Sequence, residues 1–72
     1  MTRIIDLPPG TTATVVSVTS DSVARLNRLA SFGVIAGTEV RLLARFPSLV
    51  VACGETSIAL EEEIGHEIFV RL

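Results

Sequence analysis

Two hydrophobic periodicities alternate along this chain. Stretches in which apolar and often β-branched residues occupy every second position are typical of half-buried strands, and turn residues separate these stretches. The pattern predicts about five short strands, at Thr12–Thr19, Thr38–Pro47, Leu49–Cys53, Ser57–Glu61 and His66–Leu72. In the second strand Phe46 shares the inward parity of Val40 and Leu42, and in the last strand His66 shares the parity of Ile68 and Val70.

One segment, Val23–Phe32, changes to a helical period. Val23, Leu26 and Ala30 form one apolar stripe along such a helix. Leu29 lies beside that stripe, and a preceding Ser-Asp-Ser sequence supplies helix-capping side chains. The helix would have about three turns and would be marginal alone, so it is expected to pack against the strands.

Glycines mark the points where the chain is expected to reverse direction. Gly33 follows the helix and is predicted to adopt the left-handed conformation that ends many helices, with Val34 making the accompanying hydrophobic contact. Gly37 and Thr38 then form a turn into the next strand. The glycines expected to support turns are Gly10, Gly33, Gly37 and Gly54.

About five strands and one short helix in 72 residues favour a mainly β fold. The predicted architecture is a small closed or half-closed β-barrel, with the helix plugging one end and residues 1–72 forming a single domain. The side chains expected to hold this barrel together are Leu26, Leu29, Val40, Leu42 and Ile68.

Composition narrows the classes of protein to consider. Hydrophobic residues make up 49% of the chain, yet no apolar run approaches the roughly 20 residues of a membrane-spanning helix. Asp6 and two prolines interrupt the N-terminal segment where an export signal needs an apolar centre. The single Cys53 cannot form an internal disulfide, which fits a reducing compartment. We therefore expect a cytoplasmic location.

The charge pattern argues against nucleic acid as a partner. The formal net charge is −2, and the six basic residues are scattered arginines rather than a concentrated basic face.

Candidate reactive groups have simple structural explanations. Glu62, Glu63, His66 and Glu67 could hold a metal ion. The preferred explanation is that the glutamates cap a helical turn and His66 starts a strand at the surface, because no second histidine or cysteine pair supplies common ligand spacing. Cys53 is interpreted as a buried structural thiol, since no basic environment surrounds it. No phosphate-binding loop or nucleophile–base pair is present, so we expect no enzyme and no cofactor.

The helix and the turn after it are the candidate partner-binding region. Arg25 and Arg28 lie on the exposed side of the helix near Phe32, and arginine with aromatic residues is enriched at protein interfaces. The side chains predicted to bind a partner are Arg25, Arg28, Phe32, Val34 and Ile35. An exposed apolar patch of Ile35, Leu43 and Leu49 is a related expectation. The alternative for the two arginines is an ordinary solvated helix face.

The segment RLASFGVIAGTEV, Arg28–Val40, resembles the signature of the FeoA family, in which an Arg-Leu pair on a short helix precedes a glycine and a Pro-Gly-Thr turn. Further segments follow in family order: Leu7–Val18, Phe46-Pro47, Gly54, Ser57–Leu60 and Ile68–Val70. Ala36 stands where the family usually has proline, Phe32 where it has leucine, and Glu61 where it has arginine. The loop after Pro47 is also shorter than is common.

The resemblance implies an SH3-like β-barrel in the bacterial cytoplasm. It implies binding to FeoB, a membrane transporter of ferrous iron with a cytoplasmic GTP-binding domain, and no direct membrane attachment. Two alternatives stay open: the regulatory SH3-like domain of a DtxR-type metal-dependent repressor, and a small transition-metal-binding protein. Self-association through an edge strand is a further option for so small and apolar a chain.

Overall fold

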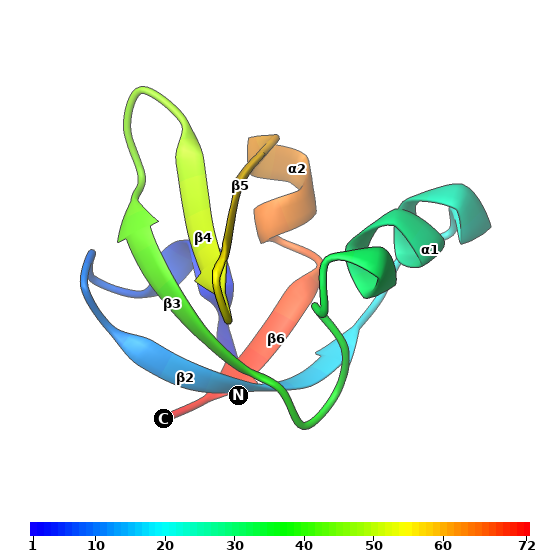
Figure 1. Cartoon of the computed structure of the whole chain (residues 1–72), viewed down its shortest axis with the longest axis horizontal. Helices are drawn as coiled ribbons and strands as arrows, with labels where there is room; N and C mark the ends of the chain where they lie inside the picture. The colour runs from blue at the N-terminus through cyan, green and yellow to red at the C-terminus, as the bar shows by residue number, and fades with distance from the viewer.

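Six antiparallel strands form one sheet that curls around a hydrophobic interior (Figure 1). The structure is a computed structural model that describes all residues, 1–72. The strands are β1 (Thr2–Arg3), β2 (Thr12–Val18), β3 (Glu39–Ala44), β4 (Leu49–Cys53), β5 (Thr56–Leu60) and β6 (Ile68–Arg71). A 3-10 turn η1 (Ile4–Asp6) and the helices α1 (Val23–Ser31) and α2 (Glu62–Gly65) complete the chain.

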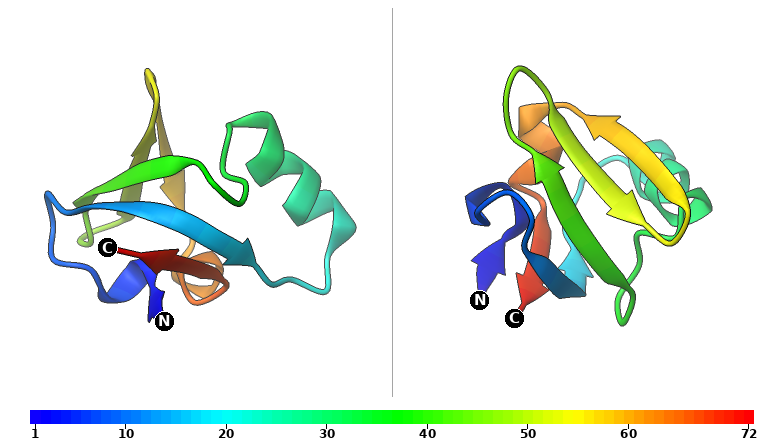
Figure 2. Two further views of the ribbon diagram at one scale, coloured as in Figure 1. Left: turned by 90° about the horizontal axis from the view of Figure 1, so that it is seen from below. Right: turned by 60° about the vertical axis from the view of Figure 1, so that its left-hand side comes forward.

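The strand order in the sheet is β1-β6-β2-β3-β4-β5, so β1 and β5 are both edges and the barrel is half-closed. Figure 2 shows β1, β6 and β2 on one side of the interior and β3, β4 and β5 on the other. This small, mainly β, SH3-like fold confirms the predicted fold class. The predicted strands are all present, and the sequence missed the two-residue β1 at the N-terminus.

Two irregularities let the sheet curl. The pairing of β2 with β6 passes from Val15–Val70 to Ser17–Phe69, so Val16 is an extra residue. The pairing of β3 with β4 skips Leu43 in the same way. Such bulges bend a strand and increase its twist, which small barrels need in order to turn corners.

The interior is a cluster of sixteen buried hydrophobic residues drawn from every strand from β2 to β6, from both helices and from η1. Four of the five side chains predicted to hold the barrel are buried there: Leu29, Val40, Leu42 and Ile68. The fifth, Leu26, is only half-buried. Helix α1 projects away from the sheet and buries only Leu29 completely, so it covers the interior less fully than a plug would (Figure 1).

Helix α1 ends as predicted, at Gly33. The backbone N–H of Gly33 donates to the carbonyl of Ala30 at 2.9 Å, and that of Val34 donates to the carbonyl of Leu29 at 2.9 Å. Gly33 has φ +88°, and Val34 and Leu29 are both buried. This arrangement is a Schellman motif, in which a left-handed residue satisfies the last carbonyls and a hydrophobic contact seals the end.

The turn that follows is fastened to β2. The N–H of Thr38 donates to the carbonyl of Ile35 at 3.2 Å, and Gly37, with φ +92°, occupies the position that requires a left-handed residue. The N–H of Gly37 also donates to the carbonyl of Val15 at 2.7 Å. Gly10 and Gly54, the other two glycines predicted to support turns, also have positive φ.

Three side chains lie elsewhere than predicted. Phe46 was expected to face inward, but β3 ends at Ala44 after its bulge, and Phe46 lies 88% exposed in the following loop. Leu49 was expected in an exposed patch, but it opens β4 on the inward face and is buried. His66 was expected in the last strand; the acidic turn before it forms α2, and His66 ends that helix with an exposed side chain.

Candidate functional site

The C-terminal half of α1 and the turn after it present an arginine and two apolar side chains to solvent. Phe32 is 38% exposed and Ile35 is 50% exposed, and the side chain of Arg28 one turn before Phe32 is exposed as well. We call Arg28, Phe32 and Ile35 the helix-end surface. The Schellman motif and the Gly37 turn fix the backbone on which this surface lies.

Val34 does not belong to this surface, contrary to the prediction. It is 1% exposed because it forms the hydrophobic contact of the Schellman motif and therefore points into the interior. The same residue could not serve both predicted roles, and the structural role is the one observed.

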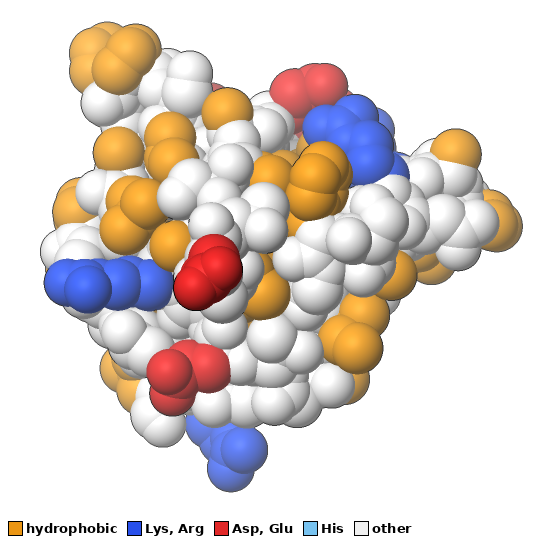
Figure 3. All heavy atoms as spheres, viewed as in Figure 1, with side chains coloured by type: hydrophobic (Ala, Val, Ile, Leu, Met, Phe, Trp, Pro, Cys, Tyr) orange, Lys and Arg blue, Asp and Glu red, His pale blue; other side chains and the backbone are white.

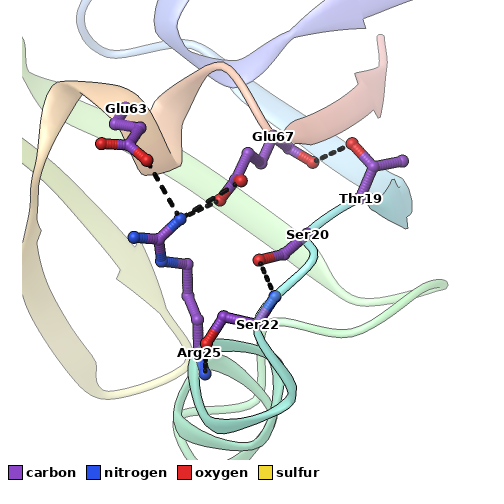
Figure 4. Close-up of polar contacts among 6 residues, drawn as sticks. All are labelled: Thr19, Ser20, Ser22, Arg25, Glu63 and Glu67. Carbon is purple, nitrogen blue, oxygen red and sulfur yellow. Dashed lines mark hydrogen bonds and ion pairs between the residues drawn. The ribbon is translucent and has the colours of Figure 1, made fainter.

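Arg25 also has a different position from the predicted one. Its Nη1 donates to both carboxylate oxygens of Glu67, at 3.1 and 3.2 Å, and lies 3.4 Å from Oε1 of Glu63 (Figure 4). The side chains of Arg25 and Glu67 are 27% and 21% exposed, so this pair is partly shielded from water. Arg25 therefore ties α1 to α2 and to the start of β6 within the molecule.

The hydrogen bond to Glu67 is the main cause that raises the pKa of the Arg25 guanidinium above its ordinary value, and the charges of Glu67 and Glu63 add to it. A cation with a raised pKa contributes its stabilisation fully below the ordinary pKa and loses it only as the pH rises through the raised value. The charge on Arg25 is therefore constant at all ordinary pH values.

The start of α1 is fastened by a short chain of polar contacts (Figure 4). Ser22 caps the helix, since its Oγ accepts from the N–H of Arg25 at 3.1 Å. The Oγ of Ser20 accepts from the N–H of Ser22 at 3.1 Å, and the hydroxyl of Thr19 donates to the backbone carbonyl of Glu67 at 3.3 Å. Helix α1 is thus held by polar contacts at its first turn and by Leu29 and Val34 near its last.

The metal-site hypothesis for Glu63, His66 and Glu67 is not supported by their arrangement. No group of three or more His, Cys, Asp or Glu side chains comes close enough together to hold a metal ion. Glu63 and Glu67 instead bind Arg25, and His66 lies exposed at the end of α2. Cys53 is a buried free thiol, in line with its interpretation as a structural residue.

Sequence reasoning missed a cleft of about 740 Å³ next to the helix-end surface. Arg28 lines this cleft from α1, the Arg45–Ser48 loop lines a second side, and Glu61, Glu62 and His66 line a third. The exposed Phe46 in that loop escaped prediction because unbroken strand alternation placed it inside. Its position directly before Pro47, which disfavours a continuing central strand, was the available signal.

The Arg25 ion pairs lead to a prediction about salt. Replacing Arg25 with methionine keeps an unbranched apolar stem but removes the guanidinium charge that Glu63 and Glu67 share. We expect the midpoint of thermal unfolding of the natural sequence to fall on raising NaCl to about 1 M, because salt screens partly exposed pairs. The R25M variant should melt lower than the natural sequence at low salt and show little of this salt dependence.

Arg28→Met is the matched control, because Arg28 is on the same helix and has no ion pair. The R28M variant should keep the salt dependence of the natural sequence. Equal salt dependence in the R25M and R28M variants would contradict the assigned role of Arg25.

No helix of the structure combines the length and the apolar character needed to cross a membrane. The family model described as the FeoA domain matches residues 2–72. No curated protein matches the sequence.

Solved structures with this fold include proteins of two kinds. A zinc complex of FeoA from Stenotrophomonas maltophilia, described as an SH3 domain protein, is 31% identical, with a TM-score of 0.85, over 99% of this chain and 91% of that one. FeoA from Chlorobium tepidum is 23% identical, with a TM-score of 0.90, over 99% of this chain and 70% of that one.

The second kind is represented by IdeR from T. acidophilum, which is 26% identical with a TM-score of 0.86. The match covers 96% of this chain but only 32% of IdeR, so the shared fold is one part of that larger protein. The family match extends over nearly all of the present sequence, and the Arg28–Val40 segment within it contains the Schellman motif and the Gly37 turn described above. The chain therefore belongs to the FeoA family.

Proposed function

We propose that this protein is a cytoplasmic accessory module of bacterial ferrous iron transport that regulates a FeoB-type transporter by binding its cytoplasmic part. Membership of the FeoA family supports the link to ferrous iron. The similar S. maltophilia protein is described as a candidate ferrous iron transport activating factor. The proposed activity is protein binding, without a catalysed reaction.

The observation that carries this proposal is the helix-end surface. Phe32 and Ile35 keep much of their apolar area in water, although the interior has buried most large aliphatic side chains of the sequence. Burying such area against a partner gains about 25 cal/mol per Å², and aromatic residues with arginine are frequent binding hot spots. Most of helix α1 is available to contact a partner, since Leu29 is its only fully buried side chain.

The proposal predicts that Arg28→Ala and Phe32→Ala each weaken binding to the isolated cytoplasmic domain of the cognate transporter by about tenfold or more, which corresponds to ~1.4 kcal/mol. Isothermal titration with and without guanine nucleotide measures the affinity. Neither change should alter the fold, because both side chains are exposed.

Val23→Ala is the matched control, since Val23 is 70% exposed on the first turn of the same helix, away from the helix-end surface. It should bind like the natural sequence. Unchanged affinity in the R28A and F32A variants would show that the transporter contacts another face. If the natural sequence did not bind the transporter's cytoplasmic domain in any nucleotide state, the proposal that it binds this domain would be contradicted.

The structural likeness to IdeR favours a second candidate, a regulatory domain of a DtxR-type repressor. In that case the helix-end surface would contact other parts of the repressor rather than a transporter. Binding of the natural sequence to a repressor's isolated N-terminal part, but not to the transporter domain, would select this candidate.

A further inference from the structure

Strand β5 is an edge of the sheet, since only β4 pairs with it. The opposite edge, β1, is only two residues long, whereas β5 has five residues, all paired with β4. Proteins protect long edges with charged residues, prolines or bulges, because an unpaired edge accepts foreign strands. The sequence of β5, TSIAL, has no charge and no proline, and its register with β4 is unbroken from Cys53–Thr56 to Leu49–Leu60.

The free backbone groups on this edge belong to Ser57 and Ala59. The two-residue loop Gly54–Glu55 joins β4 to β5, which makes Cys53 and Thr56 the hydrogen-bonded pair that closes the hairpin. Hydrogen-bonded and non-hydrogen-bonded pairs alternate along an antiparallel ladder, so Ser57 and Ala59 direct their N–H and C=O groups away from β4. Neither residue takes part in a hydrogen bond to any other element, and both side chains are exposed.

The surroundings of the edge are acidic. From Phe46 to Val70 the chain contains no lysine or arginine, and Glu55 and Glu61 directly flank β5. The cleft at the Leu60 end contributes three carboxylates, from Asp6, Glu61 and Glu62, against the two arginines Arg28 and Arg45. The net local charge is therefore negative at both ends of the strand.

This charge pattern disfavours a second copy of the chain as the occupant. When two β5 strands pair antiparallel about Ile58, Ser57 faces Ala59 of the other copy, which satisfies the free groups. The same register places Glu55 opposite Glu61 of the other copy at both ends, and like charges directly opposite are destabilising.

We propose that the β5 edge binds an extended segment of a partner protein by strand addition, and that this segment has small or β-branched residues at its centre and lysine or arginine at its ends. The main-chain bonds to Ser57 and Ala59 would supply affinity, and the flanking glutamates would supply selectivity. The site lies on the sheet, and its Ala59 lines the same cleft as Arg28 of the helix-end surface. It depends on the proposed function only for the identity of the protein that supplies the segment.

Two synthetic peptides of about nine residues test the proposal, each with a Thr-Val-Thr-Val-Thr centre as long as β5. One has two lysines at each end and the other has two glutamates. Fluorescence anisotropy at low salt measures affinity, and NMR amide exchange reports on Ser57 and Ala59. We expect the basic peptide to bind at least about tenfold more tightly than the acidic one and to slow exchange of both amides.

Ala59→Pro removes one outward N–H without touching the ladder to β4, and Ala59→Val is the matched control that keeps it. The A59P variant should lose most of the affinity and the A59V variant should keep it. The double variant Glu55→Lys with Glu61→Lys leaves the backbone intact and should prefer the acidic peptide, which provides a test even where the proline variant fails to fold.

Equal binding of both peptides, exchange unchanged at Ser57 and Ala59, or full affinity in the A59P variant would each overturn the proposal. Concentration-dependent protection of these amides without peptide would overturn it in favour of a second copy. The transporter experiment separates the two proposals. Transporter binding by the natural sequence together with equal binding of the two peptides would reject the edge site alone, whereas peptide binding without transporter binding would reject only the proposed function.

Discussion

Replacing Leu29 with alanine is expected to lower the free energy of unfolding by about 2–5 kcal/mol, the range for truncating a buried leucine. Leu29 is 1% exposed and is the only side chain of α1 that is completely buried. It also seals the Schellman motif through Val34, so its loss removes both the packing of the helix and the hydrophobic contact that ends it. Urea denaturation followed by far-UV circular dichroism measures the change.

Leu26→Ala is the matched control, because it is the same change on the same helix at a half-buried position. The sequence predicts equal importance for Leu26 and Leu29, whereas the structure predicts that the L26A variant loses less than half as much stability. Equal losses would mean that α1 packs on the sheet through its whole apolar stripe. A loss well below 1 kcal/mol for the L29A variant would contradict its position in the interior.

The contrast between these two leucines shows how far the sequence could lead. The helical period correctly located the helix between Val23 and Phe32, and the glycine after it correctly located the end. Periodicity gives the direction of an apolar stripe but not how much of it a curled sheet can cover. Of the predicted stripe, Leu26 is half-buried and both Val23 and Ala30 are exposed, whereas Leu29 beside it is the residue that the sheet covers.

The strands were predictable because their apolar residues also follow a regular period, whereas the irregularities in their pairing were not predictable. Alternation located β4 and β5 with nearly correct ends, since nothing interrupts their register. The register shift at Leu43 was not predicted, and β3 ends at Ala44 directly after it, so Phe46, predicted to lie inside, is exposed in the following loop. A bulge depends on how two strands meet in space, which no single strand's sequence specifies.

The sequence likewise predicted the positions of some residues of the candidate site correctly and of others wrongly. Arg28, Phe32 and Ile35 were predicted at the surface and lie there, because their exposure follows from helix and turn geometry alone. Arg25 was predicted beside them, but its partners Glu63 and Glu67 lie some forty residues later in the sequence, a separation of 38 residues for Glu63. Long-range partners of this kind follow from the topology that brings α2 next to α1, and Glu61 and Glu62 entered the cleft by the same route.

The second large effect is expected at Gly33. Replacing it with alanine should destabilise the protein by about 2–3 kcal/mol for two separate reasons. A side chain at φ +88° costs about 1–2 kcal/mol in the left-handed region. The added Cβ would also lie 3.2 Å from Sγ of the buried Cys53, a contact that costs roughly 1 kcal/mol of overpacking. Chemical denaturation gives the total.

Gly37→Ala isolates the first of these costs, since Gly37 has nearly the same φ, +92°, and a Cβ there would meet nothing within 4 Å. The G37A variant should therefore lose only about 1–2 kcal/mol. A double-mutant cycle with Cys53→Ala isolates the second cost, because removing Sγ gives the new methyl group its space. In that background the G33A change should cost no more than G37A does. If it costs as much as in the natural sequence, the contact with Cys53 has relaxed without penalty, and backbone conformation alone explains why glycine is needed where α1 ends.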